Sequence, residues 1–202
     1  MSRPINFFAP GEWYHCYSRG IDKRIVFENQ SDHQRFVALL YLANSSITLH
    51  RSILGHLNHH ELFSIPRGES LVSIGAYALM PNHFHLLLHE KNEGGISTFM
   101  QKLGTAYTMY FNIKHERIGG LFTKPFRARH VSDDRYFQYV VDYIHLNPLE
   151  LFEHKQKESK NPSRRRLDMV KLKTKIKTCP DLLTFLRQAN GIIATAVALI
   201  SA

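Results

Sequence analysis

The segment MPNHFHLLL, residues 80–88, organises this chain, because it sets two histidines two positions apart at the start of an apolar run. Successive side chains of a β-strand point to opposite faces, so His83 and His85 share one face while the apolar residues at 84, 86 and 88 share the other. Pro81-Asn82 is typical of a turn, and the apolar stretch 71–80 favours a strand, so the two stretches predict a hairpin. One face could hold a metal ion while the other fills a core. Taken alone, such a histidine pair is more typical of a strand edge without a ligand.

Composition narrows the class of partner. The chain has 202 residues, 44% of them apolar, which suits one domain with an appendage. Lys and Arg outnumber Asp and Glu by 26 to 17, a net charge of +9, which favours a polyanionic partner and nucleic acid first. Cys16 and Cys179 lie far apart, which argues against a disulfide framework or a thiolate zinc site and fits a reducing cytoplasm.

Neither end of the chain has the pattern of a membrane segment. The N-terminus lacks a long apolar run, and the apolar stretch 191–202 is too short to span a bilayer. We therefore expect a soluble protein of the cytoplasm, associated with the nucleoid if its partner is DNA, and no membrane partner.

On the N-terminal side of the hairpin, aromatic residues predict a strand over 13–18, followed by a basic turn over 19–24. Apolar spacings of three and four predict a helix that begins at Ser31 or Asp32 and ends near residue 44. Residues 47–68 give few signals, and we interpret their irregularly spaced histidines as parts of a solvated loop or short helix rather than as ligands: His50, His56, His59 and His60.

On the C-terminal side, a second helix is predicted from Ser97, with an apolar stripe that ends at Phe111. Residues 121–131 alternate apolar and basic side chains and predict a strand that presents Lys124, Arg127 and Arg129 to phosphates. A third helix begins at Asp133 or Asp134 and is stopped by Pro148. The order strand, helix, two strands, helix, strand, helix predicts an α+β fold, a ferredoxin-like or RRM-like antiparallel sheet with helices on one face.

Beyond this domain the composition changes. Residues 155–177 hold ten basic and two acidic residues and include Arg164-Arg165-Arg166. We therefore expect a basic C-terminal extension that binds DNA. A helix that packs back on the domain could follow it.

Tyr143 and Asn147 are the residues that could form a catalytic metal site together with the two histidines. They are four positions apart, so on a helix they project from one face. An amide oxygen from Asn147 would complete a set of three neutral ligands with His83 and His85, which leaves open positions for phosphate oxygens on a divalent cation. Manganese, magnesium and zinc all accept such ligands. Taken alone, Tyr143 also fits the role of a tyrosine packed in the core, and Asn147 that of a helix C-cap.

Three motifs in one order resemble the single-tyrosine HUH transposases, most closely the REP-associated tyrosine transposases: MPNHFH at 80–85, YTMYFN at 107–112 and YIHLNP at 143–148. The resemblance covers about residues 13–148. It implies that His83 and His85 are the metal pair, that Tyr143 is the nucleophile, and that Asn147 is the third ligand, where related insertion-sequence transposases usually carry glutamine. It implies an HUH catalytic domain over 1–150 and a basic extension over 151–202.

The resemblance further implies a transposase that uses Mg²⁺ or Mn²⁺ to cleave and transfer single-stranded DNA, near a hairpin formed by a palindromic repeat, through a 5′-phosphotyrosine. The chain would act as a monomer or homodimer. A phenol with a pKa of roughly 10 is a weak nucleophile at neutral pH, so a cation next to the scissile phosphate fits this chemistry. We expect DNA contacts from basic side chains in the three segments named above: Arg19, Lys23 and Arg24; Lys124, Arg127 and Arg129; and Arg164, Arg165 and Arg166.

Several alternatives remain open at the level of sequence. Tyr107 and Tyr110 are rival nucleophiles, although their apolar neighbours favour packing. Residues 14, 15 and 17 of the first strand could alternate between the core and a nucleic-acid face. The whole domain could be a non-catalytic RRM-like binding module, or a metal-dependent nuclease in which activated water attacks in place of Tyr143.

Overall fold

The computed structural model describes residues 8–48, 61 and 63–156. The four histidines predicted to be solvated (50, 56, 59 and 60), Cys179 and the basic run 164–166 lie outside the described residues. The chain divides into two compact units, Met1–Pro148 and Leu149–Ala202, and the fold below is that of the first.

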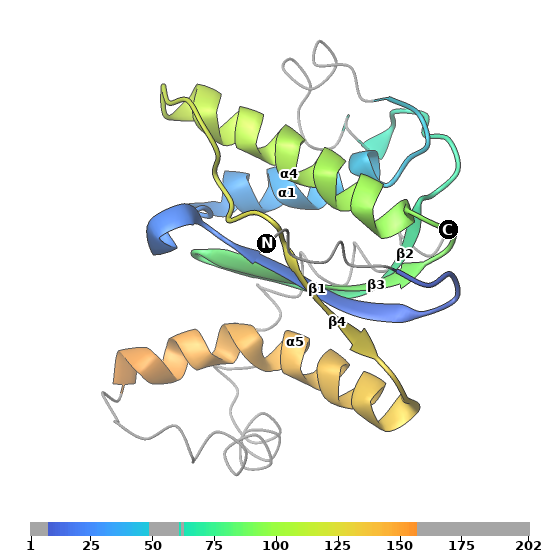
Figure 1. Ribbon diagram of the computed structural model, residues 1–202. Coiled ribbons are helices and arrows are strands. Elements are labelled where there is room, and N and C mark those ends of the chain that lie inside the picture. The colour runs from blue at the N-terminus through green and yellow to red at the C-terminus, as the bar shows by residue number, and fades with distance from the viewer. Residues whose placement is uncertain (1–7, 49–60, 62, 157–202) are drawn as a thin grey trace, which may run out of the picture. The chain divides into compact units, whose positions relative to one another are not determined.

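The predicted order of elements is confirmed, and Figure 1 shows it along the chain. The strands are β1 (Trp13–Arg19), β2 (Val72–Met80), β3 (His83–Glu90) and β4 (Arg127–Val131). The helices are the short η1 (Ile21–Lys23), α1 (Gln30–Ala43), α4 (Gly95–Lys114) and α5 (Asp134–Gln156). None of the helices in the described part of the chain combines the length and the apolar character that a transmembrane span requires.

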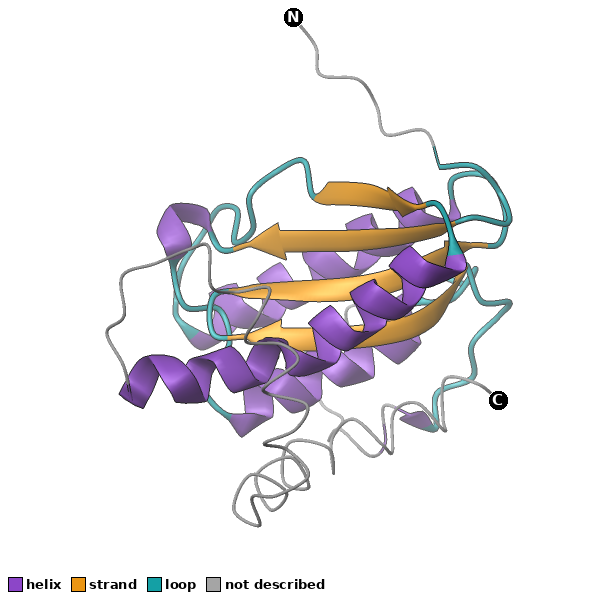
Figure 2. Ribbon diagram, turned by 90° about the horizontal axis from the view of Figure 1, so that it is seen from below, coloured by secondary structure: helices purple, strands orange, loops and turns teal. Residues whose placement is uncertain are grey.

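The sheet has the order β2-β3-β1-β4, and every neighbouring pair is antiparallel. This is the ferredoxin-like arrangement, in which β1 lies in the middle of the sheet although it comes first in the chain. Figure 2 shows the four strands side by side. The predicted α+β fold class is therefore confirmed, and β4 is an edge strand, as the alternation of basic residues over 121–131 indicated.

The two faces of the sheet are covered differently (Figure 1). Helices α1 and α4 lie on one face, where the rings of Phe36, Phe84 and Tyr107 are almost fully buried and Phe36 lies 5.0 Å from both of the others. The first part of α5 lies on the opposite face, where Val140 and Ile144 pack over the sheet. The prediction of helices on one face is confirmed for α1 and α4, whereas α5 covers the opposite face, on which the histidines lie.

Four element boundaries differ from the predicted ones. Helix α5 continues through Pro148, where the prediction ended it, to Gln156, because a proline inside a helix removes one backbone hydrogen bond and can bend the helix without ending it. Helix α1 is capped by Asn29 rather than Ser31 or Asp32, because the Asn29 side chain accepts from the Asp32 N–H while Asp32 accepts from the Asn29 N–H. Helix α4 begins at Gly95, two residues before the predicted start, where the Glu90 carboxylate accepts two backbone N–H groups. Strand β4 begins at Arg127, and the segment before it pairs only through a bridge between Gly20 and Phe122.

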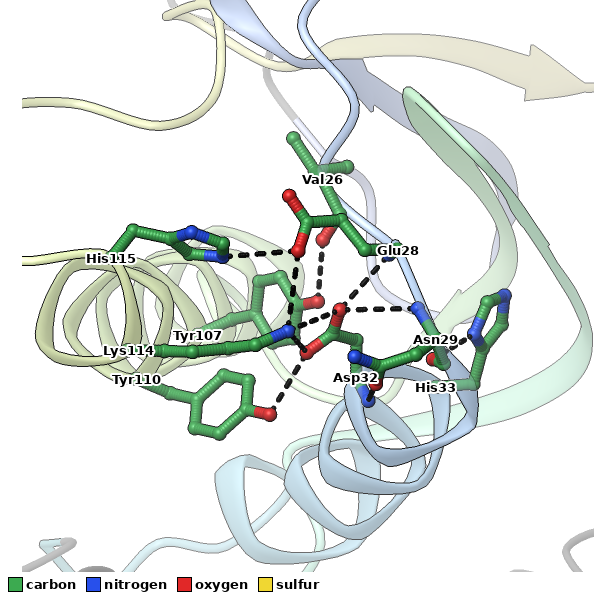
Figure 3. Close-up of polar contacts among 9 residues, drawn as sticks. All are labelled: Val26, Glu28, Asn29, Asp32, His33, Tyr107, Tyr110, Lys114 and His115. Atoms are coloured by element: carbon green, nitrogen blue, oxygen red, sulfur yellow. Dashed lines mark hydrogen bonds and ion pairs between the residues drawn. The ribbon is translucent and has the colours of Figure 1, made fainter.

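A buried carboxylate ties the start of α1 to the end of α4 (Figure 3). The Asp32 side chain is fully buried and accepts from Lys114 Nζ at 2.9 and 3.0 Å, from Tyr110 Oη at 2.9 Å and from the Glu28 N–H at 2.9 Å. Burial by itself raises the pKa of Asp32, but these hydrogen bonds outweigh it and hold the pKa below its ordinary value. The carboxylate is therefore ionised and fully paired at neutral pH.

We expect Asp32→Asn to lower the free energy of unfolding by about 2 kcal/mol, because it removes the charge that Lys114 and Tyr110 bind while the shape is kept. Urea unfolding followed by circular dichroism measures this. Glu28→Gln is the control: Glu28 also pairs with Lys114, at 3.3 Å, but its side chain is 40% exposed, so the loss should stay below about 1 kcal/mol. Equal losses in the two variants would contradict the role given to Asp32.

The stabilisation from Asp32 should also depend on pH with a definite sign. Because its pKa is lowered in the folded state, the unfolded chain takes up the proton first, so the stabilisation is present above the ordinary Asp range and is lost as the pH falls through the folded pKa. The difference in unfolding free energy between the unaltered chain and Asp32→Asn should therefore shrink as the pH falls below about 4. A difference that grew on acidification would show that Asp32 is not paired.

Candidate active site

Strand register brings the polar residues of three strands together on one face of the sheet. Cross-strand neighbours point to the same face, and β1 pairs Arg19 with His83 and Tyr17 with His85. On its other side β1 pairs Tyr17 with Arg127 and His15 with Arg129. The two predicted ligand histidines and two of the predicted basic residues of β4 therefore share the face that α5 covers.

The three histidines of this face form a connected group. His15 Nε2 lies 2.8 Å from His85 Nδ1, and both side chains are buried. The rings of His83 and His85 are 5.0 Å apart and nearly perpendicular. His83 Nδ1 lies 2.7 Å from Asn82 Oδ1, at the turn between β2 and β3. The ring of Tyr17 packs against His85 at 5.6 Å.

Helix α5 brings Tyr143 to this group. The Tyr143 ring lies 5.5 Å from that of His85 and 5.9 Å from that of His15, edge to face in both cases. Asn147 follows one turn later on the same face of the helix and is buried. The structure thus brings Tyr143 of α5 to the histidine pair of β3, and Asn147 lies one helical turn beyond Tyr143.

Burial keeps the three imidazoles uncharged. It lowers the pKa of His85 to about 3, with the neighbouring histidines adding to the effect, and the pKa of His15 to about 4, with the charge of Arg129 adding to it. The pKa of His83 is lowered as well, by burial first and then by the charge of Arg19. Neutral imidazole is the form that binds a metal ion.

Two buried polar atoms at this site lack a hydrogen-bond partner among the described residues: His85 Nε2 and Asn147 Nδ2. Such atoms are rare in folded proteins and indicate a missing water or ion. The amide of Asn147 can turn by half a rotation, which exchanges its nitrogen for its oxygen. Within the described residues, no group of three or more His, Cys, Asp or Glu could hold a metal ion. A cation here would therefore need the amide of Asn147 besides His83 and His85, and this donor set suits it.

The two rival tyrosines lie elsewhere. Tyr107 is fully buried on α4 and donates its hydroxyl to the Val26 carbonyl at 2.7 Å. Tyr110 donates to Asp32 at 2.9 Å, and burial followed by this hydrogen bond raises its pKa to about 12 (Figure 3). Both lie on the side of α1 and α4, so neither reaches the histidine face.

The predicted basic residues are distributed over two settings. Arg19, Arg127 and Arg129 are exposed at the histidine face. Lys124 is exposed in the segment before β4, and Lys23 and Arg24 lie in and after η1, next to the β2–β3 turn, where the Lys23 carbonyl accepts from Asn82.

Sequence reasoning misses the contacts of His15 and Asn82. It predicts that His15 lies on the first strand and allows it to face nucleic acid, but it cannot pair that strand with the histidine hairpin. It identifies Asn82 only as a turn residue. The signal that is present is the period of two, which puts the residues at 15, 17 and 19 on one face.

The comparisons with known proteins agree with this fold. Residues 56–147 match the protein family described as "Transposase IS200 like". Among solved structures, a REP-associated tyrosine transposase bound to a REP hairpin superimposes with a TM-score of 0.50 and 14% sequence identity over 74% of each chain. No curated protein matches the chain. The resemblance found in the sequence is therefore confirmed, and the structural likeness extends it to the fold.

Proposed function

We propose that this chain, which resembles the IS200-like transposases over residues 56–147, is a transposase-like enzyme that cleaves and transfers single-stranded DNA through Tyr143. The observation that carries the proposal is the position of the Tyr143 ring 5.5 Å from His85, with Asn147 on the same helix face. A tyrosine and two neutral imidazoles therefore lie next to one another, and a buried amide follows one turn later on the helix.

His83, His85 and Asn147 would hold a divalent cation, Mg²⁺ or Mn²⁺. When bound, the cation would polarise the scissile phosphate. Two buried atoms without a hydrogen-bond partner among the described residues, His85 Nε2 and Asn147 Nδ2, support this assignment, because a half-turn of the amide would put its oxygen in the place of Nδ2.

The chain's own part in the reaction is nucleophilic. The Tyr143 hydroxyl loses its proton to solvent and its oxygen attacks phosphorus, which forms the tyrosine–phosphate bond. The bond from phosphorus to the 3′ oxygen breaks, and that oxygen takes up a proton, so the products are a 5′-phosphotyrosine and a free 3′-hydroxyl. Attack by a 3′-hydroxyl of a second DNA end would reverse the step and transfer the strand. No nucleotide cofactor is consumed.

Basic residues around the histidines would hold the DNA backbone. Arg19, Arg127 and Arg129 share the face of the site, so they can bind phosphates next to the scissile one. Lys23, Arg24 and Lys124 would extend this contact at the rim. The solved relative was bound to a REP hairpin, which supports a DNA hairpin as the partner of this chain too. The catalytic domain would comprise residues 1–150. Residues 151–202 would form an extension that binds DNA through Arg164, Arg165 and Arg166.

Two other functions make different products. A non-catalytic RRM-like module would leave DNA intact, and a nuclease that activates water would release free ends. Only attack by tyrosine leaves DNA covalently attached to protein, so a denaturing gel of the chain incubated with a hairpin oligonucleotide and Mn²⁺ separates the three.

We expect Tyr143→Phe to abolish the covalent adduct while DNA affinity and fold are kept, because only the attacking oxygen is lost. Mass spectrometry of the digested adduct locates the modified peptide. Tyr139→Phe is the matched control on the same helix, with a ring that is 48% exposed, and it should retain the adduct. The structure adds Tyr17 as the rival to test, since its ring lies 5.6 Å from His85. An adduct on Tyr17, or one that persists in Tyr143→Phe, would overturn the assignment.

His83→Ala and His85→Ala should each remove cleavage but leave most of the hairpin affinity, because the histidines act at one phosphate while affinity is spread over many basic contacts. Gel shifts at fixed salt measure the affinity, and the denaturing gel measures cleavage. Loss of binding as complete as the loss of cleavage would mean that the histidines have a structural role only.

Arg127→Ala and Arg129→Ala should weaken DNA binding and make it less dependent on salt. The slope of the logarithm of the binding constant against the logarithm of the salt concentration should fall in magnitude by roughly 0.7 for each phosphate of single-stranded DNA that loses its basic partner. Lys91→Ala is the charge-matched control, because Lys91 is exposed just after the opposite end of β3 from His83. If Lys91→Ala changed the slope as much as either arginine variant, binding would follow net charge and not this face.

A further inference from the structure

An imidazole can bind a metal ion only through a nitrogen that carries a lone pair, and its two nitrogens exchange roles between tautomers. Something must therefore hold each ring of a histidine pair in one tautomer and one orientation. In this chain the second nitrogen of each ring contacts a side chain that takes no part in the proposed chemistry, Asn82 for His83 and His15 for His85.

The contact to Asn82 has a defined direction. Asn82 Nδ2 donates to the Lys23 carbonyl at 3.3 Å, so its Oδ1 is the atom that faces His83 Nδ1 at 2.7 Å. An amide oxygen only accepts hydrogen bonds. His83 must therefore carry its proton on Nδ1, which leaves the lone pair on Nε2. The turn at residues 81 and 82 is itself held in place, because the Pro81 carbonyl accepts from Val26 and Phe27 and the Asn82 carbonyl accepts from Gly20.

The contact to His15 has the same consequence for His85. His15 Nε2 and His85 Nδ1 are 2.8 Å apart in a buried setting, so one donates and the other accepts. If His85 donates, its lone pair lies on Nε2, the buried atom with no partner among the described residues. In the opposite arrangement that atom would be a buried N–H with no acceptor, which a cation could not satisfy.

We propose that His15 and Asn82 are positioning residues, which accept hydrogen bonds from Nδ1 of His85 and His83 and so turn both Nε2 lone pairs to the metal site. The role of the metal site in this inference rests on the proposed function, whereas the tautomers of the two histidines rest on the two hydrogen bonds alone. His15 is not itself a ligand, because its Nε2 is occupied by His85. Acceptors of this kind set the tautomer and raise the basicity of metal-binding histidines in general.

The sequence around His15 suits this role. Strand β1 holds it between β3 and β4, and its ring lies 5.3 Å from that of Tyr17 and 5.9 Å from that of Tyr143. The ring therefore packs against two aromatic neighbours, and the strand that carries it is paired on both edges. A positioning group on a central strand has little freedom to move.

The first test reads tautomers directly in the metal-free full-length chain. Nitrogen-15 NMR of labelled histidine distinguishes a protonated Nδ1 from a protonated Nε2, and His83→Ala and His85→Ala assign the signals. We expect Nδ1–H on both rings in the unaltered chain. His15→Phe, which keeps an aromatic ring next to the two tyrosines, should let the His85 tautomer mix and leave His83 unchanged. Asn82→Ala should do the reverse. A His85 ring protonated on Nε2 in the unaltered chain, or one unaffected by His15→Phe, would overturn the proposal.

The second test measures Mn²⁺ affinity by calorimetry without DNA. His15→Phe should weaken binding by roughly 10- to 100-fold, the usual effect of losing such an acceptor, whereas His15→Gln, whose amide oxygen can accept, should restore much of it. A purely structural role would lower the melting temperature in both variants without separating their affinities. If both variants lost binding as fully as His85→Ala, His15 would be a ligand and the positioning role would be wrong.

The two tests separate this inference from the proposed function. If Mn²⁺ bound no more tightly to the unaltered chain than to His85→Ala, the metal site of the proposed function would fail. The tautomer measurement, which needs no metal, would still decide whether His15 and Asn82 hold the two rings as inferred.

Discussion

The pairing of β1 with both β3 and β4 governs the arrangement of the core and of the candidate site. Residues of β1 alternate between the two faces of the sheet, and its register sets Arg19 beside His83 and Tyr17 beside His85. A shift of one residue would turn His15 into the apolar core and Cys16 out of it. The buried Cys16 and its neighbours on the apolar face make such a shift costly, so the core on one side fixes the site on the other.

The two faces of the sheet differ in whether their buried polar groups have hydrogen-bond partners. Toward α1 and α4 the interior is apolar, and the buried carboxylates of Asp32 and Glu90 accept hydrogen bonds from side chains or from backbone N–H groups. Toward α5 the side near residues 140 and 144 is apolar, but the group around His85 retains polar atoms without partners among the described residues. Satisfied polar groups stabilise a fold, while unsatisfied ones cost free energy and persist where a ligand completes them.

Helix α5 links these properties to chemistry. Its apolar positions pack on Ala76, Ala78 and Leu87, small and medium side chains that let the helix approach the sheet. That approach brings Tyr143 within ring contact of His85 and His15. The nucleophile proposed here is therefore held by the packing of its own helix, and the two histidines by hydrogen bonds to side chains of a neighbouring strand and turn.

Short-range patterns in the chain were enough to predict the element order and the fold class, and together with the family resemblance they singled out the histidine pair and Tyr143, which lie in ring contact. These patterns are the period of two at residues 83–88, the turn at 81–82, the helical stripe ending at Phe111 and the four-residue spacing of Tyr143 and Asn147. Helix starts were less well predicted, because Asn29 and Glu90 cap α1 and α4 through contacts that propensity does not reveal. Three features emerged from the folded structure alone: that Tyr107 and Tyr110 lie on the opposite face from the histidines, that α5 covers the histidine face, and that His15 meets His85 from 70 residues away. Such contacts depend on strand register and helix packing, which arise from the complementarity of whole surfaces and leave no periodic signal in the chain.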